Sequence, residues 1–126
     1  FNNTTSESNA KVKIYVGSNN LPSGTIASTD YWNFGFLGSV TNVTSDAVTN
    51  GTNYDQGRIR HDHAQAVYHG YHSWKVAGHE VGHILGMNHF EKSPAHSGDH
   101  WMKSGSFTLS NPTATDIAHL RVKWRY

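Results

Sequence analysis

One eleven-residue run that begins at His79, HEVGHILGMNH, constrains this chain more than any other feature. On a helix, residues four apart lie on one face and one turn apart, so His79 and His83 would point toward a common centre. Glu80 would lie about a hundred degrees round the helix, at the edge of that face. Gly86 accepts the positive φ that a sharp helix end requires. The chain can then bring His89 back toward the first two histidines from another direction.

This arrangement predicts a metal centre. Three neutral imidazoles with one open position form the ligand set of a catalytic zinc ion. Cobalt, nickel and copper also bind three imidazoles, so the pattern does not fix the metal. The alternative is a histidine-rich amphipathic helix without a metal. We predict that His79, His83 and His89 bind one Zn²⁺.

The surrounding residues predict a buried helix over 73–85, with Ser73 as its N-cap. Zinc bound there would polarise a water molecule and lower its pKa toward neutrality. Glu80 could reach that water without being a ligand, and we predict that it is the general base. The apolar residues at helical spacing are Val76, Ala77, Val81, Ile84 and Leu85.

The same run resembles the zinc-binding consensus of the metzincin clan of metallopeptidases. A second signature of that clan, a methionine in a tight turn beneath the metal, is matched by Met102. Ser104 stands where astacins and serralysins carry a metal-binding tyrosine, and the chain has no cysteine for a matrixin-type cysteine switch. His89 argues against the branch with aspartate as third ligand. The resemblance is therefore closest to the matrixin-like branch, and it covers residues 73–126 well and the first half only in outline.

A helix near the C-terminus is expected as well. The segment 109–117 resembles the start of the C-terminal helix of matrixin-like metzincins. Independently, Pro112 suits a first helical turn, with Ser110 or Asn111 as cap. An apolar stripe would follow, formed by Ile117, Leu120 and Trp124.

The resemblance implies an α+β, metzincin-like zincin domain: a mixed twisted sheet with an active-site helix and a C-terminal helix. It implies a zinc-dependent endopeptidase whose substrate, a protein or peptide, lies extended along an edge strand. By order along the chain, that edge is expected at 25–29. The segment 103–109 would wall a side-chain pocket, with Gly105 and Phe107 setting its depth. Metzincins normally begin with a strand and a long helix, neither of which is visible here, so we expect further residues upstream.

The first half of the chain is typical of strands and loops. Alternating apolar residues predict a strand over 12–17. Asn, Pro and Gly residues predict a turn region over 18–24, and 25–32 could form a second strand. The segment 34–52 suggests an irregular loop or hairpin. A further strand is expected over 57–67, with Ile59, His61 and His63 on one side.

Other histidines invite the question of a second metal. His61, Asp62, His63, His69 and His72 precede the motif helix, but their spacing does not match the structural zinc site of matrixins. We therefore expect one catalytic ion and no second structural metal. His96, Asp99 and His100 are expected on a solvated loop, where His100 could approach the rim of the metal site.

Composition limits the remaining possibilities. With 126 residues and 36% hydrophobic content, the chain suits one domain, 1–126, with a strand and loop part (1–72) and a motif part (73–126). A net charge of +1 favours neither nucleic acid nor an anionic membrane as partner, and no run reaches transmembrane length. We expect a secreted monomer. Two alternatives stay open: a zinc hydrolase of a non-protein amide such as cell-wall peptide cross-links, and an inactive zinc-binding module.

Overall fold

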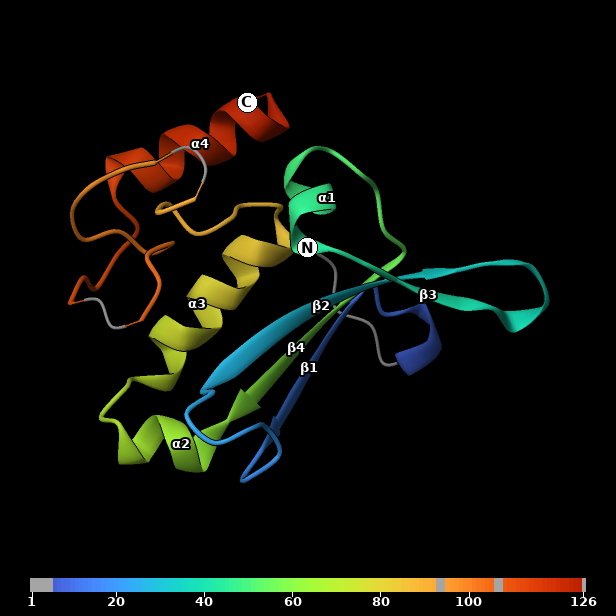
Figure 1. The fold of residues 1–126 in the computed structure, drawn as a ribbon, viewed down its shortest axis with the longest axis horizontal. Helices are drawn as coiled ribbons and strands as arrows, with labels where there is room; N and C mark the ends of the chain where they lie inside the picture. The colour runs from blue at the N-terminus through green and yellow to red at the C-terminus, as the bar shows by residue number, and fades with distance from the viewer. Residues whose placement is uncertain (1–5, 93–94, 106–107, 126) are drawn as a thin grey trace.

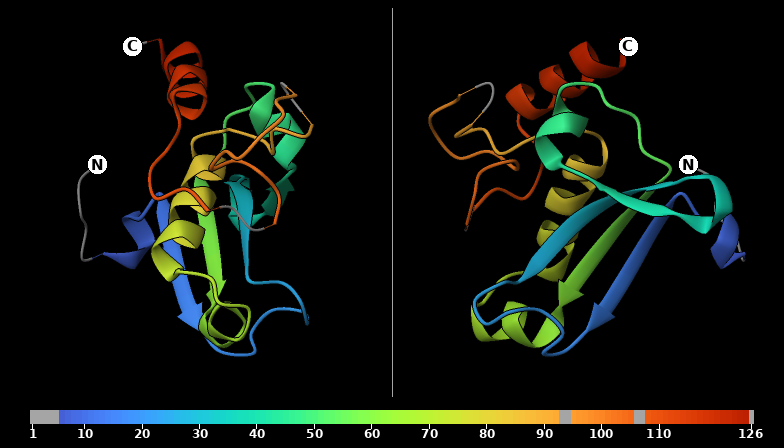
Figure 2. Two further views of the ribbon diagram at one scale, coloured as in Figure 1. Left: turned by 90° about the vertical axis from the view of Figure 1, so that its left-hand side faces the viewer. Right: turned by 45° about the vertical axis from the view of Figure 1, so that its right-hand side comes forward.

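The α+β class predicted from the sequence is confirmed by the computed structural model, which describes residues 6–92, 95–105 and 108–125. Within those residues the chain forms a four-stranded mixed sheet and four α-helices (Figure 1). Helix α3 crosses one face of the sheet, and α4, the last helix of the chain, lies above α3 in the view of Figure 1 (Figures 1 and 2). In chain order the elements are η1 (Glu7–Asn9), β1 (Val12–Gly17), β2 (Ala27–Phe34), η2 (Phe36–Gly38), β3 (Val40–Val43), α1 (Ser45–Thr49), β4 (Gln56–Asp62), α2 (His63–Tyr68), α3 (Ser73–Ile84) and α4 (Ala114–Trp124).

The sheet has the strand order β1-β4-β2-β3. Strand β1 runs parallel to β4, and β2 runs antiparallel to both β4 and β3. Only the second half of β2, from Tyr31 to Phe34, pairs with β3. The first half, from Ala27 to Asp30, pairs with β4 alone among the described residues. The strand predicted over 12–17 is therefore confirmed, and the second strand is present but lies two residues later than the predicted 25–32. Within the described part of the chain, the start of β2 presents an open sheet edge.

Helix α3 packs against β2 and β4, and this contact forms the main core. Buried apolar side chains from the sheet, α1 and α3 meet there: Tyr31, Val48, Ile59 and Ile84. The hydroxyl of Tyr31 donates to the carbonyl oxygen of His83 at 2.9 Å, so a core side chain also anchors the helix that carries the motif. The predicted helix is confirmed, but Ser73 is its first residue and His72 occupies the N-cap without a side-chain cap bond.

The prediction of one strand over 57–67 is wrong beyond Asp62. The carboxylate of this fully buried residue accepts hydrogen bonds from the backbone N–H of Gln65 at 3.1 Å and of Asn20 at 3.0 Å. It thereby caps α2 and ends β4, because an aspartate at an N-cap satisfies the free amides of a first helical turn. His63 consequently starts α2 and does not share a strand face with His61.

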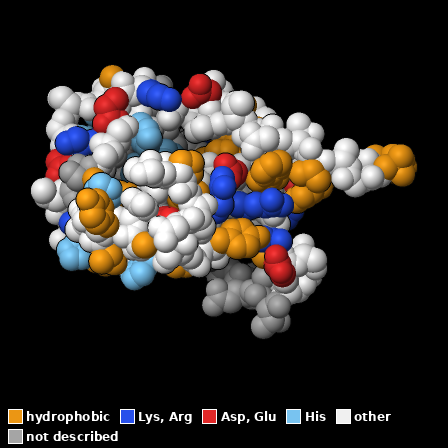
Figure 3. Space-filling model, turned by 60° about the horizontal axis from the view of Figure 1, so that its bottom comes forward, with side chains coloured by type: hydrophobic (Ala, Val, Ile, Leu, Met, Phe, Trp, Pro, Cys, Tyr) orange, Lys and Arg blue, Asp and Glu red, His pale blue; other side chains and the backbone are white. Residues whose placement is uncertain are grey.

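The segment 34–52 contains the β2–β3 hairpin, as suggested, but also the short helix α1, which the sequence analysis did not predict. Thr44 caps α1 by accepting from the N–H of Ala47. The hairpin tip projects from the body of the molecule and ends in apolar side chains (Figure 3). Phe36 and Leu37 at this tip are 89% and 91% exposed.

The C-terminal helix is present, but its cap and its buried face differ from the prediction. Thr113 is the N-cap, in place of the predicted caps Ser110 and Asn111, and a capping box joins it to Asp116. The helix turns Asp116 and Leu120 inward, whereas Ile117 and Trp124 remain largely exposed. Among the described residues, no helix is long and apolar enough to cross a membrane.

Candidate metal centre

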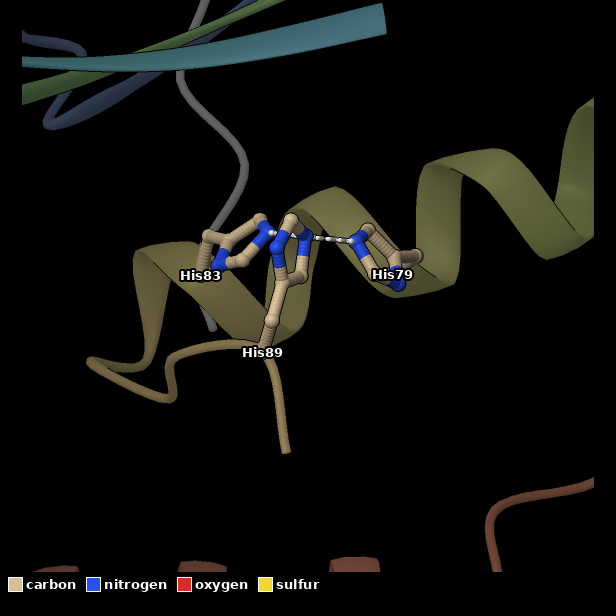
Figure 4. A group of neighbouring side chains, drawn as sticks. All are labelled: His79, His83 and His89. Carbon is tan, nitrogen blue, oxygen red and sulfur yellow. Dashed lines mark hydrogen bonds between the residues drawn. The ribbon is translucent and has the colours of Figure 1, made fainter. Parts of the chain in front are cut away.

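Three histidine side chains converge beside α3. His79 and His83 project from consecutive turns of the helix, and the chain then turns through Gly86, whose φ is +81°, to bring in His89 (Figure 4). The Nε2 atom of His79 lies 3.1 Å from that of His83 and 3.1 Å from that of His89, and the third separation is 3.2 Å. Within the described residues, this is the only group of three or more side chains able to hold a metal ion.

In His79 and His83, the ring nitrogen that points away from the centre has its own hydrogen-bond partner, and this fixes which nitrogen faces the centre. The Nδ1 atom of His79 lies at the carbonyl oxygen of Trp101, and the Nδ1 atom of His83 lies 2.9 Å from the carbonyl oxygen of Met87. A carbonyl oxygen only accepts, so both Nδ1 atoms carry the proton, as in most metal-ligating histidines. The two Nε2 lone pairs then face each other and repel unless a cation lies between them. Three nitrogens at about 2.0–2.1 Å from one tetrahedral ion lie roughly 3.3 Å apart, so the residues present fit such an ion.

Burial keeps these ligands neutral. Burial, together with the neighbouring His79, lowers the pKa of His83 to about 4. Burial also lowers the pKa of His79 and of His89. An imidazole binds a metal only when it is unprotonated, so near neutral pH all three rings are ready to bind without first losing a proton.

Glu80 lies beside the three histidines but is not one of the group. It is buried, and its carboxylate accepts a hydrogen bond from the hydroxyl of Thr29 on β2, with 2.5 Å between the oxygens. Burial raises the pKa of Glu80 to about 7, and the Thr29 hydrogen bond opposes that rise. A carboxyl group with a pKa near neutrality both takes up and releases a proton readily at physiological pH.

Two glycines let a later segment approach α3 closely. Gly78 and Gly82 lie one turn apart, each directly before a histidine of the centre. A Cβ atom at Gly78 would overlap the ring of Trp101, and one at Gly82 would overlap the sulfur of Met102. Met102 is fully buried, as expected for the methionine under the site. The glycines thus form the surface on which the 101–102 turn sits.

The same turn is tied to α4 through Asp116, which is 1% exposed. Its carboxylate accepts from the backbone N–H of Trp101 at 3.3 Å and of Met102 at 3.4 Å while it also closes the capping box with Thr113. One buried carboxylate therefore joins the turn beneath the histidines to the start of the last helix.

A cleft of about 330 Å³ opens at the centre. It is lined by the segment 24–27, which leads into the open half of β2, and by His79, Glu80 and His89. Gly105, predicted to help set the depth of a side-chain pocket, also lines it, whereas Phe107 lies outside the described residues. A larger cavity of about 440 Å³, bordered by Tyr54 and Trp124, has no histidine in its lining.

The other predicted polar residues lie elsewhere. The rings of His61 and His63 are 6.4 Å apart, and neither joins the group of three. His100 is near the start of α4, where its Nδ1 contacts the hydroxyl of Thr113 at 3.0 Å, and it does not line the cleft. Among the described residues, therefore, the three histidines of the eleven-residue run form the group that could hold a metal ion, and none of the histidines before α3 joins it.

Sequence reasoning did not identify Thr29, Asp116 or the two glycines. Two glycines one turn apart inside a predicted helix were a usable signal, because each costs helix stability and indicates a close approach. Thr29 had no such signal, since its position depends on strand pairing. Comparisons with protein families, with curated proteins and with solved structures found no match to this chain.

Proposed function

We propose that this protein is a zinc-dependent endopeptidase of the metzincin type, closest to the matrixin-like branch. The observation that carries the proposal is that three imidazoles converge beside a buried glutamate, and that a cleft lined by His79, Glu80 and His89 also reaches Ala27 at the start of the open sheet edge. A purely structural zinc site uses four protein ligands and has no need of an adjacent base. We also propose, from the resemblance alone, that the protein acts as a secreted monomer.

Different residues would bind the metal, transfer the proton and position the base. His79, His83 and His89 would hold the ion, which when bound supplies a polarised water and a positive charge for the developing oxyanion. Glu80 would take the proton from the attacking water and deliver it to the nitrogen of the leaving amine. Its raised pKa suits both transfers. Thr29 would hold the carboxylate in place through its hydrogen bond.

The open half of β2 supports the choice of substrate class. Residues Ala27–Asp30 have β4 on one side and no strand on the other among the described residues. An extended peptide can add to such an edge through backbone hydrogen bonds. The adjoining segment 24–27 lines the same cleft as His79 and Glu80, so a peptide bound there would pass in front of the centre.

The test compares unfolded casein with purified cell wall as substrates for the zinc-loaded protein. We expect casein cleavage that a chelator stops and added zinc restores. In Glu80→Gln, cleavage should fall by about 10²–10⁴-fold with zinc still bound, because a general base typically contributes that much. Glu7→Gln, an exposed carboxylate paired with Lys13, is the matched control and should cleave normally.

Two outcomes would overturn the proposal. Release of peptide from cell wall without casein cleavage would assign the centre to a non-protein amide. Zinc bound at full occupancy with no turnover of either substrate would make the chain an inactive zinc-binding module.

A further inference from the structure

Outside the three-histidine group, two further histidines, His96 and His119, face each other. The Nε2 atom of His96 lies 2.8 Å from the Nε2 atom of His119, which α4 carries. Their ring centroids are 4.9 Å apart. In the three-histidine group the corresponding separations are 4.7, 5.1 and 4.8 Å. The pair therefore has the ring spacing of the metal centre itself.

Both imidazoles rest on a fixed support. The buried ring of Phe90 lies 5.3 Å from the ring of His96 and 5.0 Å from the ring of His119. The backbone N–H of His96 donates to the carbonyl oxygen of Phe90 at 2.9 Å, which fixes the loop. His119 sits one turn after Asp116, the buried residue that anchors α4. These contacts hold the two rings with their Nε2 atoms facing each other.

Although the sequence led us to expect no second structural metal, from this geometry we propose that His96 and His119 form a second metal site, which takes Zn²⁺, Ni²⁺ or Cu²⁺ through two imidazoles and completes its coordination with water. Imidazole nitrogen suits these ions, and two facing Nε2 atoms supply two adjacent ligand positions. His100 is a neighbour and not a ligand, since its nitrogens contact Thr113 and Ser97. This site does not depend on the proposed peptidase activity.

An ion held by this pair would join the 95–100 loop to the last helix. The loop follows His89 and leads into Trp101 and Met102, whose backbone N–H groups are already bonded to Asp116. The second ion would therefore add a link between the 95–100 loop and α4, beside the link that Asp116 already makes between α4 and the 101–102 turn. With two ligands and greater exposure, it binds more weakly than the three-histidine group and fills second.

The test is a zinc titration by calorimetry of the chelator-treated chain, with Zn²⁺ alone as the probe. The parent should bind two equivalents, a tight one and a weaker one, and the second should raise the melting temperature. His96→Gln and His119→Gln should each weaken the second equivalent at least tenfold and lose that rise. Both should keep the tight first equivalent, which also shows that they fold.

His69→Gln is the matched control, since it removes an exposed histidine remote from the pair in sequence, and it should bind both equivalents. Binding of one equivalent by the parent would overturn the proposal and leave the pair as an N–H···N hydrogen bond. A second equivalent that survives unchanged in His119→Gln would also overturn it, because the ion would then bind elsewhere.

Discussion

The three-histidine group and the His96–His119 pair place imidazole rings at nearly the same separation, yet their surroundings differ. Two rings of the first group project from α3 and are fixed by the carbonyl oxygens of Trp101 and Met87, and the group opens on a cleft. The second pair joins an exposed loop position to a later helix.

The difference lies in what accompanies the ligands. Beside the first group lie Glu80, with a pKa of about 7, and the open half of β2, where a substrate could pair. The His96–His119 pair has an aromatic support, Phe90, and its acidic neighbour Asp116 is already committed to a helix cap. Ring spacing is therefore compatible with ion binding at both places, whereas the three-histidine group alone of the two has a buried glutamate and an adjoining cleft, which hydrolytic chemistry requires.

The largest expected contrast comes from removing one ligand of each set. His83→Gln should lose the tight metal and all chelator-sensitive cleavage, because two remaining imidazoles no longer enclose the ion. His119→Gln should cleave casein within about twofold of the parent, since a support of this kind contributes little to the chemical step. Equal losses in the two variants, measured on metal-saturated protein, would show that the two sets are not functionally distinct.

Close packing under the first group should have the next largest effect. In Gly82→Ala the new methyl group would overlap the sulfur of Met102, and overpacking in a core typically costs about 1–3 kcal/mol. We expect the upper end of that range in urea unfolding. Met102→Ala combined with Gly82→Ala should cost less than the sum of the two single changes, because the smaller side chain removes the overlap. Strict additivity would refute the contact.

The third effect depends on pH in the metal-free protein. Burial raises the pKa of Glu80 to about 7 from an ordinary value of 4.5, so folding favours its protonated form. The stability that this preference contributes is fully present below pH 4.5 and is lost as the pH rises through 7. Glu80→Gln is neutral throughout and should be more stable than the parent at pH 8 by about 3 kcal/mol.

That advantage should shrink by more than half at pH 5. His83, whose pKa is lowered to about 4, destabilises both proteins as the pH falls, so its contribution cancels from the comparison. Urea unfolding of the two metal-free proteins at both pH values measures the difference. A gap that is the same at pH 5 and pH 8 would show that Glu80 does not titrate as described.

The smallest effect concerns Thr29. Thr29→Val removes the hydroxyl that bonds the Glu80 carboxylate, and that bond lowers the pKa of Glu80. The acid limb of the pH–rate profile should therefore move to higher pH by about one to two units, since a hydrogen bond to a charged group is worth about 1.5–3 kcal/mol. Thr29→Ser keeps the hydroxyl and should restore the parent profile, an outcome that a purely structural role for Thr29 would not produce.

Features that depend on local spacing were predictable from the sequence. The i, i+4 relation of His79 and His83, the turn at Gly86 and the alternation over 12–17 all follow from backbone geometry. The end of β4 was not predictable from alternation, because the carboxylate of Asp62 caps α2 and overrides the strand pattern. The cap at Thr113 was not predicted, because Pro112 suits the first turn of a helix and so favoured a cap before it, whereas the capping box with Asp116 starts the helix after Pro112.

Features that depend on tertiary packing were out of reach. His96 and His119 are 23 residues apart, and no periodicity relates them. Thr29 meets Glu80 only because β2 pairs with β4 and α3 crosses both strands. The candidate metal ligands could therefore be predicted from sequence spacing, whereas the residues that hold them in place depend on tertiary packing.

The measurement that tests the central claim most directly is zinc X-ray absorption on protein loaded with one equivalent of the ion. We predict three imidazole nitrogens at about 2.0–2.1 Å and one further oxygen from water, with the same spectrum in Glu80→Gln. A fourth protein ligand, or a spectrum that changes when Glu80 is replaced, would contradict the account. The ion would then be closed off as in a structural site, and Glu80 would not be the base.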